Sequence, residues 1–281
     1  MRSEKRMNVA TETTESVVQI GDIAIALRTS DERFCEALRD RYAGFLSSAD
    51  PDVSLDLDVT ANGPVSDDDV RVRRDGKLWL FERGDFQARW DPLTGRGHVR
   101  QNPNPYALDS VLRILHSLVL TARGGFLLHA ASAICDGQAY LFSGVSGAGK
   151  TTITRLAPDS VTLLTDEISY VRPSPAGYLA HGTPFAGELA KAGENAVAPV
   201  SALFFLEQGP DNRVDDLPSA EAVRRLMRNI LFFAEDRELV EKLLATACNF
   251  VEKIPVRRLT FYPDSRVWDE IRNFESVPAH V

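Results

Sequence analysis

The strongest constraint on this chain is the run Gly-Val-Ser-Gly-Ala-Gly-Lys-Thr at residues 144–151. It has the spacing of a phosphate-binding loop, in which backbone N–H groups surround the phosphates of a nucleoside triphosphate. An apolar segment, residues 139–142, precedes the run, and a helix-forming segment follows it and ends before Pro158. The strand–loop–helix context that this motif requires is therefore present, which predicts an α/β core that binds ATP.

Each position of the loop has an expected task. The glycines let the backbone wrap closely around phosphate, and the start of the following helix adds partial positive charge. Lys150 is expected to reach the β- and γ-phosphates, and Thr151 to ligate Mg²⁺. The predicted nucleotide-binding residues are Gly144, Val145, Ser146, Gly147, Ala148, Gly149, Lys150, Thr151 and Thr152.

A second signal lies before the loop, where Asp136-Gly137 separates two apolar segments. This dipeptide is typical of a two-residue hairpin, so the strand entering the loop is expected to be antiparallel to its predecessor. Counting back from the turn places His129 opposite Gly144. The histidine can then contact the γ-phosphate or the acceptor hydroxyl, or it can simply bond a backbone carbonyl at a strand end.

Two adjacent acids, Asp166 and Glu167, follow the apolar run at residues 161–164. Neighbouring side chains on a strand point to opposite sides, so we expect the two acids to have different tasks. One is expected to hold Mg²⁺ and the other to accept the substrate proton, with the choice between them open. The alternative is a solvated acidic strand end, which the phosphate-loop context disfavours.

Two further segments carry candidate residues. The turn-rich stretch at residues 181–188, with His181 and Glu188, suits a loop that closes over phosphates, although an ordinary connection explains it nearly as well. Arg224, Arg225 and Arg228 share one helical stretch and can either clamp a phosphate or form a solvated face paired with acids such as Glu221. We favour the solvated face.

Hydrophobic periodicity predicts a divided chain. Residues 1–15 are expected to form a disordered tail, residues 16–103 an N-terminal α+β domain, and residues 104–281 a kinase-like domain. The helix predicted at 107–122 is expected to pack against the domain that follows it. The other predicted elements are a strand at 17–27, a helix at 31–46, an antiparallel meander over 53–59, 77–82, 86–90 and 97–100, strands at 201–207 and 256–261, and helices at 220–233 and 239–251.

Composition excludes several classes of partner. The net charge is −8 and no segment concentrates Lys or Arg, which argues against a nucleic-acid partner. Neither a signal peptide nor a membrane-spanning segment is predicted. Cys35, Cys135 and Cys248 show no paired spacing, which fits a reducing cytoplasm.

Taken together, several motifs resemble the HPr kinase/phosphorylase-like family across residues 125–265: Leu128-His129-Ala-Ala-Ser, the hairpin, the phosphate loop, Asp166-Glu167-Ile-Ser, Thr183-Pro-Phe-Ala-Gly-Glu188 and 201–206. The resemblance implies a phosphate-loop core of the HPr kinase and phosphoenolpyruvate carboxykinase type, behind an N-terminal antiparallel β-rich domain. It also implies transfer of phosphate from ATP with Mg²⁺ to a serine hydroxyl. By this match, His129 corresponds to the histidine that precedes the family's loop.

The chain also departs from that family. The acidic pair normally reads Asp-Asp, and the Arg-Gly-Leu-Gly signature of true HPr kinases is not found. A dedicated HPr-modifying enzyme is therefore not expected, and the sequence is more similar to divergent bacterial relatives that include lasso-peptide kinases.

The sequence thus predicts an ATP- and Mg²⁺-dependent kinase that acts on a hydroxyl, with a serine of a peptide or protein as acceptor. The catalytic candidates are His129, Lys150, Asp166 and Glu167, and the metal candidates are Thr151, Asp166 and Glu188. A small-molecule hydroxyl as acceptor and a non-catalytic ATP-sensing module are the alternatives. A carboxykinase ranks last, because no basic carboxylate-binding cluster is found. The sequence does not decide between a monomer and a homo-oligomer.

Overall fold

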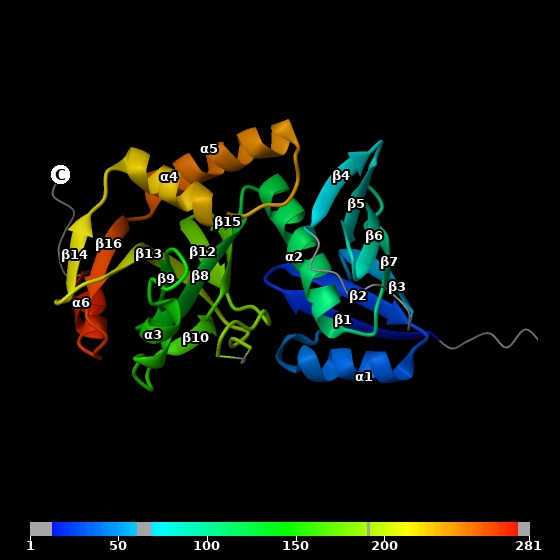
Figure 1. The fold of residues 1–281 in the computed structure, drawn as a ribbon, viewed down its shortest axis with the longest axis horizontal. Coiled ribbons are helices and arrows are strands. Elements are labelled where there is room, and N and C mark those ends of the chain that lie inside the picture. Colours follow the sequence, from blue (N-terminus) through cyan, green and yellow to red (C-terminus); the bar gives the residue numbers. More distant parts are fainter. Residues whose placement is uncertain (1–12, 61–68, 190–191, 275–281) are drawn as a thin grey trace, which may run out of the picture.

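The computed structural model describes residues 13–60, 69–189 and 192–274. Two β-sheets lie side by side with one helix between them, so the fold is a mixed α+β fold (Figure 1). Most of the predicted tail, residues 1–15, lies outside the described residues, but strand β1 already begins at Thr14. The helices are α1 Glu32–Arg41, α2 Pro105–Ala122, α3 Lys150–Arg155, α4 Ser219–Asn229, α5 Arg237–Lys253 and α6 Val267–Phe274.

The first sheet has seven strands in the order β1-β2-β3-β7-β6-β5-β4. Strands β5, β6 and β7 confirm the antiparallel meander predicted over 77–100, and β4, a strand that was not predicted, pairs with β5 beside it. The sheet is not wholly antiparallel as predicted, because β3 runs parallel to both β2 and β7. Helix α1 crosses over between β2 and β3, and such a crossover produces a parallel pair. The strands are β1 Thr14–Ile20, β2 Ile23–Thr29, β3 Val53–Val59, β4 Arg71–Asp75, β5 Leu78–Arg83, β6 Phe86–Asp91 and β7 Arg96–Gln101.

The single strand predicted at 17–27 is instead a hairpin of β1 and β2. Gly21 and Asp22 form its turn, and Gly21 has φ +63°, a conformation that glycine adopts without steric cost. The predicted helix at 31–46 is confirmed as far as Arg41, and a short 3-10 turn, Ala43–Phe45, replaces its last part. Asp31 caps α1 by accepting from the Phe34 N–H.

The second sheet has nine strands, with the main path β10-β8-β11-β12-β13-β16-β14. Strand β13 is parallel to both β9 and β16, whereas the other pairs are antiparallel. The strands are β8 Phe126–Cys135, β9 Gln138–Ser143, β10 Thr162–Thr165, β11 Ile168–Ser174, β12 Gly177–His181, β13 Val197–Gln208, β14 Arg213–Asp216, β15 Ile230–Leu231 and β16 Val256–Phe261.

The predicted hairpin before the glycine-rich loop is confirmed. Asp136 and Gly137 both have positive φ, at 50° and 79°, as a type I′ turn requires. The ladder between β8 and β9 runs from Cys135↔Gln138 to Ala130↔Ser143 in the predicted register. Beyond the end of β9, the short strand β15 pairs with the same edge of β8.

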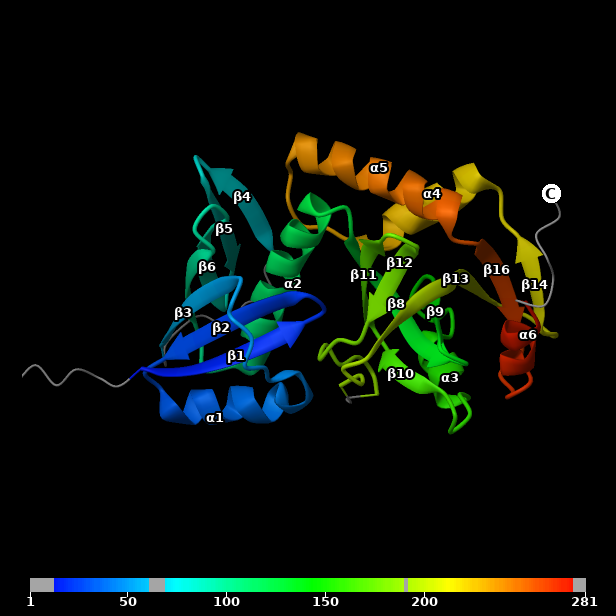
Figure 2. The same ribbon diagram turned by 180° about the vertical axis from the view of Figure 1, so that it is seen from behind.

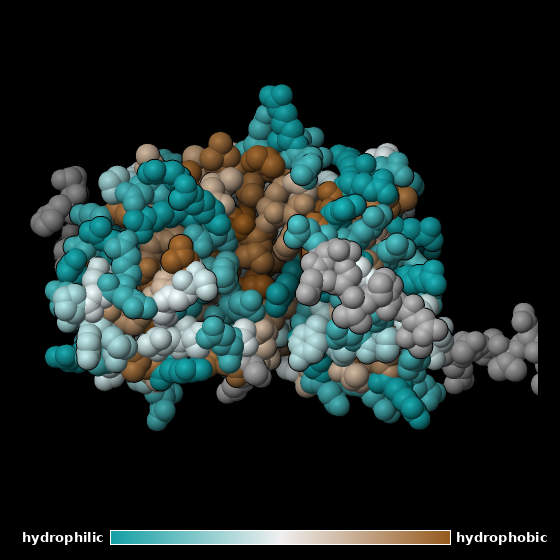
Figure 3. Space-filling model, in the orientation of Figure 1, coloured by the Kyte–Doolittle hydropathy of each residue, from teal (hydrophilic) through white to brown (hydrophobic). Residues whose placement is uncertain are grey.

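Helices cover both faces of the second sheet. Buried residues of α4 and α5 pack on one face, and those of α3 and α6 on the other, as Figure 2 shows from behind. The predicted helix at 220–233 ends at Asn229, because the chain there extends into β15. Figure 3 shows apolar side chains in the hollow between the two halves. After β15 the chain continues into Phe232 and Phe233, which are partly buried against the apolar cluster of the first sheet.

Helix α2 joins the two halves. Its apolar face contributes residues such as Val111 and Leu115 to one cluster with the first sheet, which also includes Ile168 and Phe185 from the second half. The expectation that this helix packs against the region after it is confirmed, and the same stripe also packs against the first sheet, which was not predicted. The division near residue 103 stays a prediction. None of the helices described here is both long and apolar enough to span a membrane.

Candidate functional site

The glycine-rich loop, residues 144–149, connects β9 to α3 and requires glycine at two positions. A Cβ on Gly144 would lie 2.8 Å from the Ala148 Cβ, and one on Gly149 would lie 2.5 Å from the Phe261 ring. Gly149 also has φ +111°, which L residues rarely adopt. The loop therefore follows a tight path that side chains would block.

The loop leaves backbone N–H groups available to a ligand. Within the part of the chain that is described, the N–H groups of residues 146–149 make one backbone hydrogen bond, from Ala148 to the Val145 oxygen at 3.0 Å. Gln208 steadies the loop by donating to the Gly147 oxygen at 2.7 Å, and Val145 is 78% exposed. Exposed, unbonded N–H groups on a fixed loop fit an anion such as a phosphate chain. Because α3 has only six residues, we assign little of this fit to a helix dipole.

Lys150 lies across the mouth of the loop. Its Nζ donates to the Gly144 oxygen at 3.1 Å, so the ammonium group is fixed beside the loop rather than extended into solvent. Burial lowers the pKa of Lys150, and the carboxylates of Glu167 and Glu188 act in the opposite direction. A half-buried ammonium group with two carboxylates within electrostatic reach therefore faces the space next to the loop.

The segment at residues 181–189 contributes an acid but not its histidine. Glu188 accepts a hydrogen bond from the Thr151 hydroxyl at 2.9 Å, which brings two of the predicted metal ligands together. His181 lies elsewhere, because its Nε2 accepts from Arg172 at 2.9 Å and its ring contacts Tyr170 edge to face.

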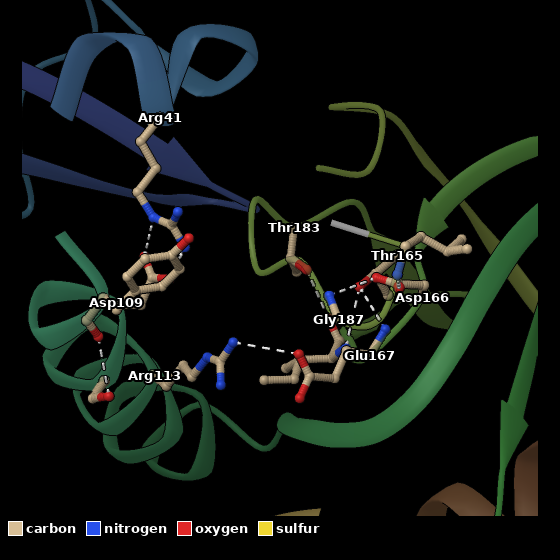
Figure 4. A network of polar contacts seen from close by, with 12 residues as sticks. Arg41, Asp109, Arg113, Thr165, Asp166, Glu167, Thr183 and Gly187 are labelled. Carbon is tan, nitrogen blue, oxygen red and sulfur yellow. Dashed lines mark hydrogen bonds and ion pairs between the residues drawn. The ribbon is translucent and has the colours of Figure 1, made fainter. Parts of the chain in front are cut away.

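The adjacent acids have different partners. Asp166 is buried, and its two carboxylate oxygens accept the N–H groups of Gly187 and Leu189, each at 2.9 Å. Asp166 therefore holds the segment that carries Glu188 (Figure 4). Glu167 faces the other way, and one of its oxygens lies 3.5 Å from the Arg113 guanidinium. The role of Asp166 as a metal ligand stays a prediction.

Glu167 and His129 surround the same space as Lys150. Burial raises the pKa of Glu167, which the positive charges of Arg113 and Lys150 partly offset. Burial also lowers the pKa of His129, and the charges of Lys150 and Arg113 lower it further. His129 lies one residue past the β8–β9 ladder, where its backbone oxygen accepts from the Ser143 hydroxyl at 2.9 Å. The contact at the strand end is therefore made by the backbone of His129 and not by its side chain.

The oxygen ligands present suit a magnesium ion that is carried by phosphates. No group of three or more metal-ligating side chains is found in residues 13–60, 69–189 and 192–274. Mg²⁺ usually keeps several waters and binds through one or two protein oxygens plus substrate phosphates. The Thr151 hydroxyl and the Glu188 carboxylate, already in contact, supply such a pair.

Sequence reasoning missed Arg113. An arginine within the apolar helical stretch at 107–122 was the available signal, because such a residue must find a partner when the helix packs.

The arginines of α4 agree with the favoured solvated face. Arg224 and Arg228 are exposed, and Arg225 pairs with Glu221 at 2.6 Å and with Glu207 at 3.0 Å.

Comparison with known proteins now identifies the family. Residues 105–275, more than half of the chain, match the family described as SynChlorMet cassette protein ScmC, and the chain belongs to that family. The match begins at α2 and includes the whole candidate site.

A second comparison concerns solved structures. The structure of the Hpr(Ser) kinase/phosphatase from Coxiella burnetii aligns over 53% of this chain and 96% of its own, with 10% identity and a TM-score of 0.30. A likeness this weak supports no conclusion about fold or activity. No curated protein matches the chain.

Proposed function

We propose that the protein is an ATP- and Mg²⁺-dependent phosphotransferase that moves the γ-phosphate to a hydroxyl, with the serine of a peptide or protein as acceptor. One observation carries the proposal: Lys150 is fixed beside the glycine-rich loop by its bond to the Gly144 oxygen at 3.1 Å, with the half-buried carboxylate of Glu167 within electrostatic reach. A cation for the phosphates beside a carboxylate for the acceptor proton is the pair that phosphoryl transfer to an alcohol needs.

Each residue then has a defined task. The unbonded N–H groups of residues 146, 147 and 149 bind the phosphate chain, and Lys150 offsets the charge on the transferred group. Thr151 and Glu188 would hold Mg²⁺, which supplies charge neutralisation at the phosphates. Asp166 keeps Glu188 in place through Gly187 and Leu189.

The proposed step is balanced within the site. The acceptor oxygen forms a bond to the γ-phosphorus while the bond from that phosphorus to the β–γ bridging oxygen breaks, which leaves ADP. Glu167 takes the acceptor proton, because its burial makes it a better base than an exposed carboxylate. His129, whose pKa is lowered, stays neutral and can donate to or accept from the acceptor hydroxyl.

The acceptor is to be sought among neighbouring gene products, since the family is described by membership of a cassette. The protein would be incubated with γ-labelled ATP, Mg²⁺ and those products, and the label located by mass spectrometry. Label on a serine supports the proposal, and label on a metabolite moves the acceptor to a small-molecule alcohol. A Lys150→Ala variant is expected to lose transfer by about 100-fold or more while keeping its fold; undiminished transfer would overturn the proposal.

A second candidate is an ATP sensor. The Thr151–Glu188 hydrogen bond links the loop directly to the segment that Asp166 holds, so a ligand at Thr151 can release that segment. Tight binding of MgATP without any labelled product, together with altered proteolysis of residues 183–189, would favour this reading.

A further inference from the structure

We propose that Arg113, on helix α2, is a second cation of this site that contacts the terminal phosphate of the bound nucleoside triphosphate. This inference rests on the proposed nucleotide site, but it does not require that phosphate be transferred. Helix α2 lies outside the strand–loop–helix unit, so Arg113 would contact the phosphate from a different element than Lys150.

The guanidinium group is held in position before any ligand arrives. It lies 5.0 Å from the centre of the Phe185 ring, in a cation–π contact, and the side chain is 23% exposed. One turn earlier on α2, Asp109 is bound by Arg41 and by the Tyr42 hydroxyl, the latter at 2.6 Å. These contacts fix the helix face that points toward Glu167, as Figure 4 shows.

Arg113 also has unused donor capacity. A guanidinium group has five N–H donors, and here its ion pair to Glu167 spans 3.5 Å, longer than a good charged hydrogen bond. Among the described residues, its Nε is buried and has no hydrogen-bond partner. Buried donors without partners are uncommon and indicate a missing ligand or water.

Lys150 and Arg113 are two cations that act on the same groups, Glu167 and His129. The carboxylates nearby already have other partners: Glu188 accepts from Thr151, Asp166 accepts two N–H groups and Asp109 pairs with Arg41. The buried Nε of Arg113 has no such partner among the described residues. A γ-phosphate offers it a charged acceptor that ADP lacks.

The test compares the affinities of MgATP and MgADP by calorimetry in the full-length protein. An Arg113→Met variant is expected to lose roughly 10- to 100-fold in MgATP affinity while MgADP affinity changes by less than about twofold, because only the terminal phosphate loses a charged contact. Arg113→Lys keeps the charge but not the planar fork, so an intermediate preference is expected. It also serves as the second variant if Arg113→Met unfolds.

Arg225 provides the matched control. It is 29% exposed and lies 5.9 Å from the Phe205 ring centre, but unlike Arg113 it already pairs closely with two glutamates, Glu207 and Glu221. Arg225→Met is expected to keep the wild-type ratio of the two affinities. An unchanged ratio in Arg113→Met, or an equal loss for both nucleotides, overturns the inference. If the wild type transfers no phosphate, the proposed function fails while the affinity ratio still decides the role of Arg113.

Discussion

The short connections between strands have different roles in the two sheets. In the first sheet, the turns at Gly21-Asp22, Gly76-Lys77 and Gly84-Asp85 simply reverse the chain, and their charges are neutralised nearby, as with Arg83 and Asp85 at 2.6 Å. In the second sheet, the connection after β9 keeps N–H groups unbonded, and the one after β10 places two acids beside it. These two connections of the second sheet therefore gather unbonded N–H groups and carboxylates around one space.

This difference suggests that the first sheet mainly stabilises the fold, whereas the second sheet carries the candidate site. The first sheet is expected to tolerate polar changes and to respond strongly to loss of apolar volume. The second is expected to lose activity after polar changes that leave the fold intact. The following predictions test that division, beginning with the largest effect.

Removal of apolar volume from the first sheet should destabilise the protein most. Phe81 is 1% exposed on β5, so Phe81→Ala leaves a cavity and is expected to lower the free energy of unfolding by about 3–5 kcal/mol. Chemical denaturation measures this change. The fraction that remains folded should bind MgATP normally, and Leu93→Ala, at a side chain 82% exposed, should change stability by less than about 0.5 kcal/mol. Weaker nucleotide binding by folded Phe81→Ala would break the comparison.

A polar change in the second sheet should affect activity instead. Asp166→Asn keeps the size of the side chain but replaces one of the two acceptors of the Gly187 and Leu189 N–H groups with an amide donor. Phosphate transfer is expected to fall about tenfold or more, since loosening Glu188 misplaces its carboxylate. Steady-state kinetics would measure the loss.

Asp91 supplies the control for that prediction. It is also buried and also accepts a turn N–H, from Leu93 at 3.0 Å, but it belongs to the first sheet. Asp91→Asn is expected to leave transfer unchanged. Equal losses in the two variants would show that buried aspartates of either sheet affect the site alike.

The last prediction concerns the pH dependence of stability and the helix between the sheets. His116 on α2 is fully buried, and burial lowers its pKa from 6.5 to about 4. As the pH falls from 6.5 to 4, the unfolded chain takes up a proton that the native protein does not, so stability decreases over that range and levels off below it. His116→Phe should flatten this part of the profile, measured by urea unfolding at each pH. His181, whose pKa is also lowered to about 4, is expected to leave a residual slope.

Local sequence signals were sufficient to predict the strands and the loop at the centre of the candidate site. The Asp136-Gly137 turn specified the register of β8 and β9, and the glycine spacing specified a loop between β9 and α3. Both depend on conformations that neighbouring residues dictate, such as positive φ at Asp136.

Features that depend on distant residues were not predicted. The parallel placement of β3 depends on where α1 lies, and the residues of β3 carry no signal for the position of that helix. The partner of Arg113 is 54 residues away at Glu167, beyond the reach of periodicity. Gly21-Asp22 is different, because this pair is a recognised hairpin signal that the continuous apolar run around it obscured.

Helix α2 has a consequence for the order in which the chain can fold. The apolar cluster around the first sheet contains Tyr170, Phe185 and Ala234, residues that leave the ribosome long after β7 is complete. During synthesis, α2 can cover the first sheet soon after β7, but the part of the cluster that Tyr170, Phe185 and Ala234 complete stays exposed while more than a hundred further residues are added. Apolar surfaces that are exposed on an incompletely folded chain promote aggregation and bind chaperones. We expect fragments that end before α2 to be insoluble, and slowly translated chains to depend most on chaperones.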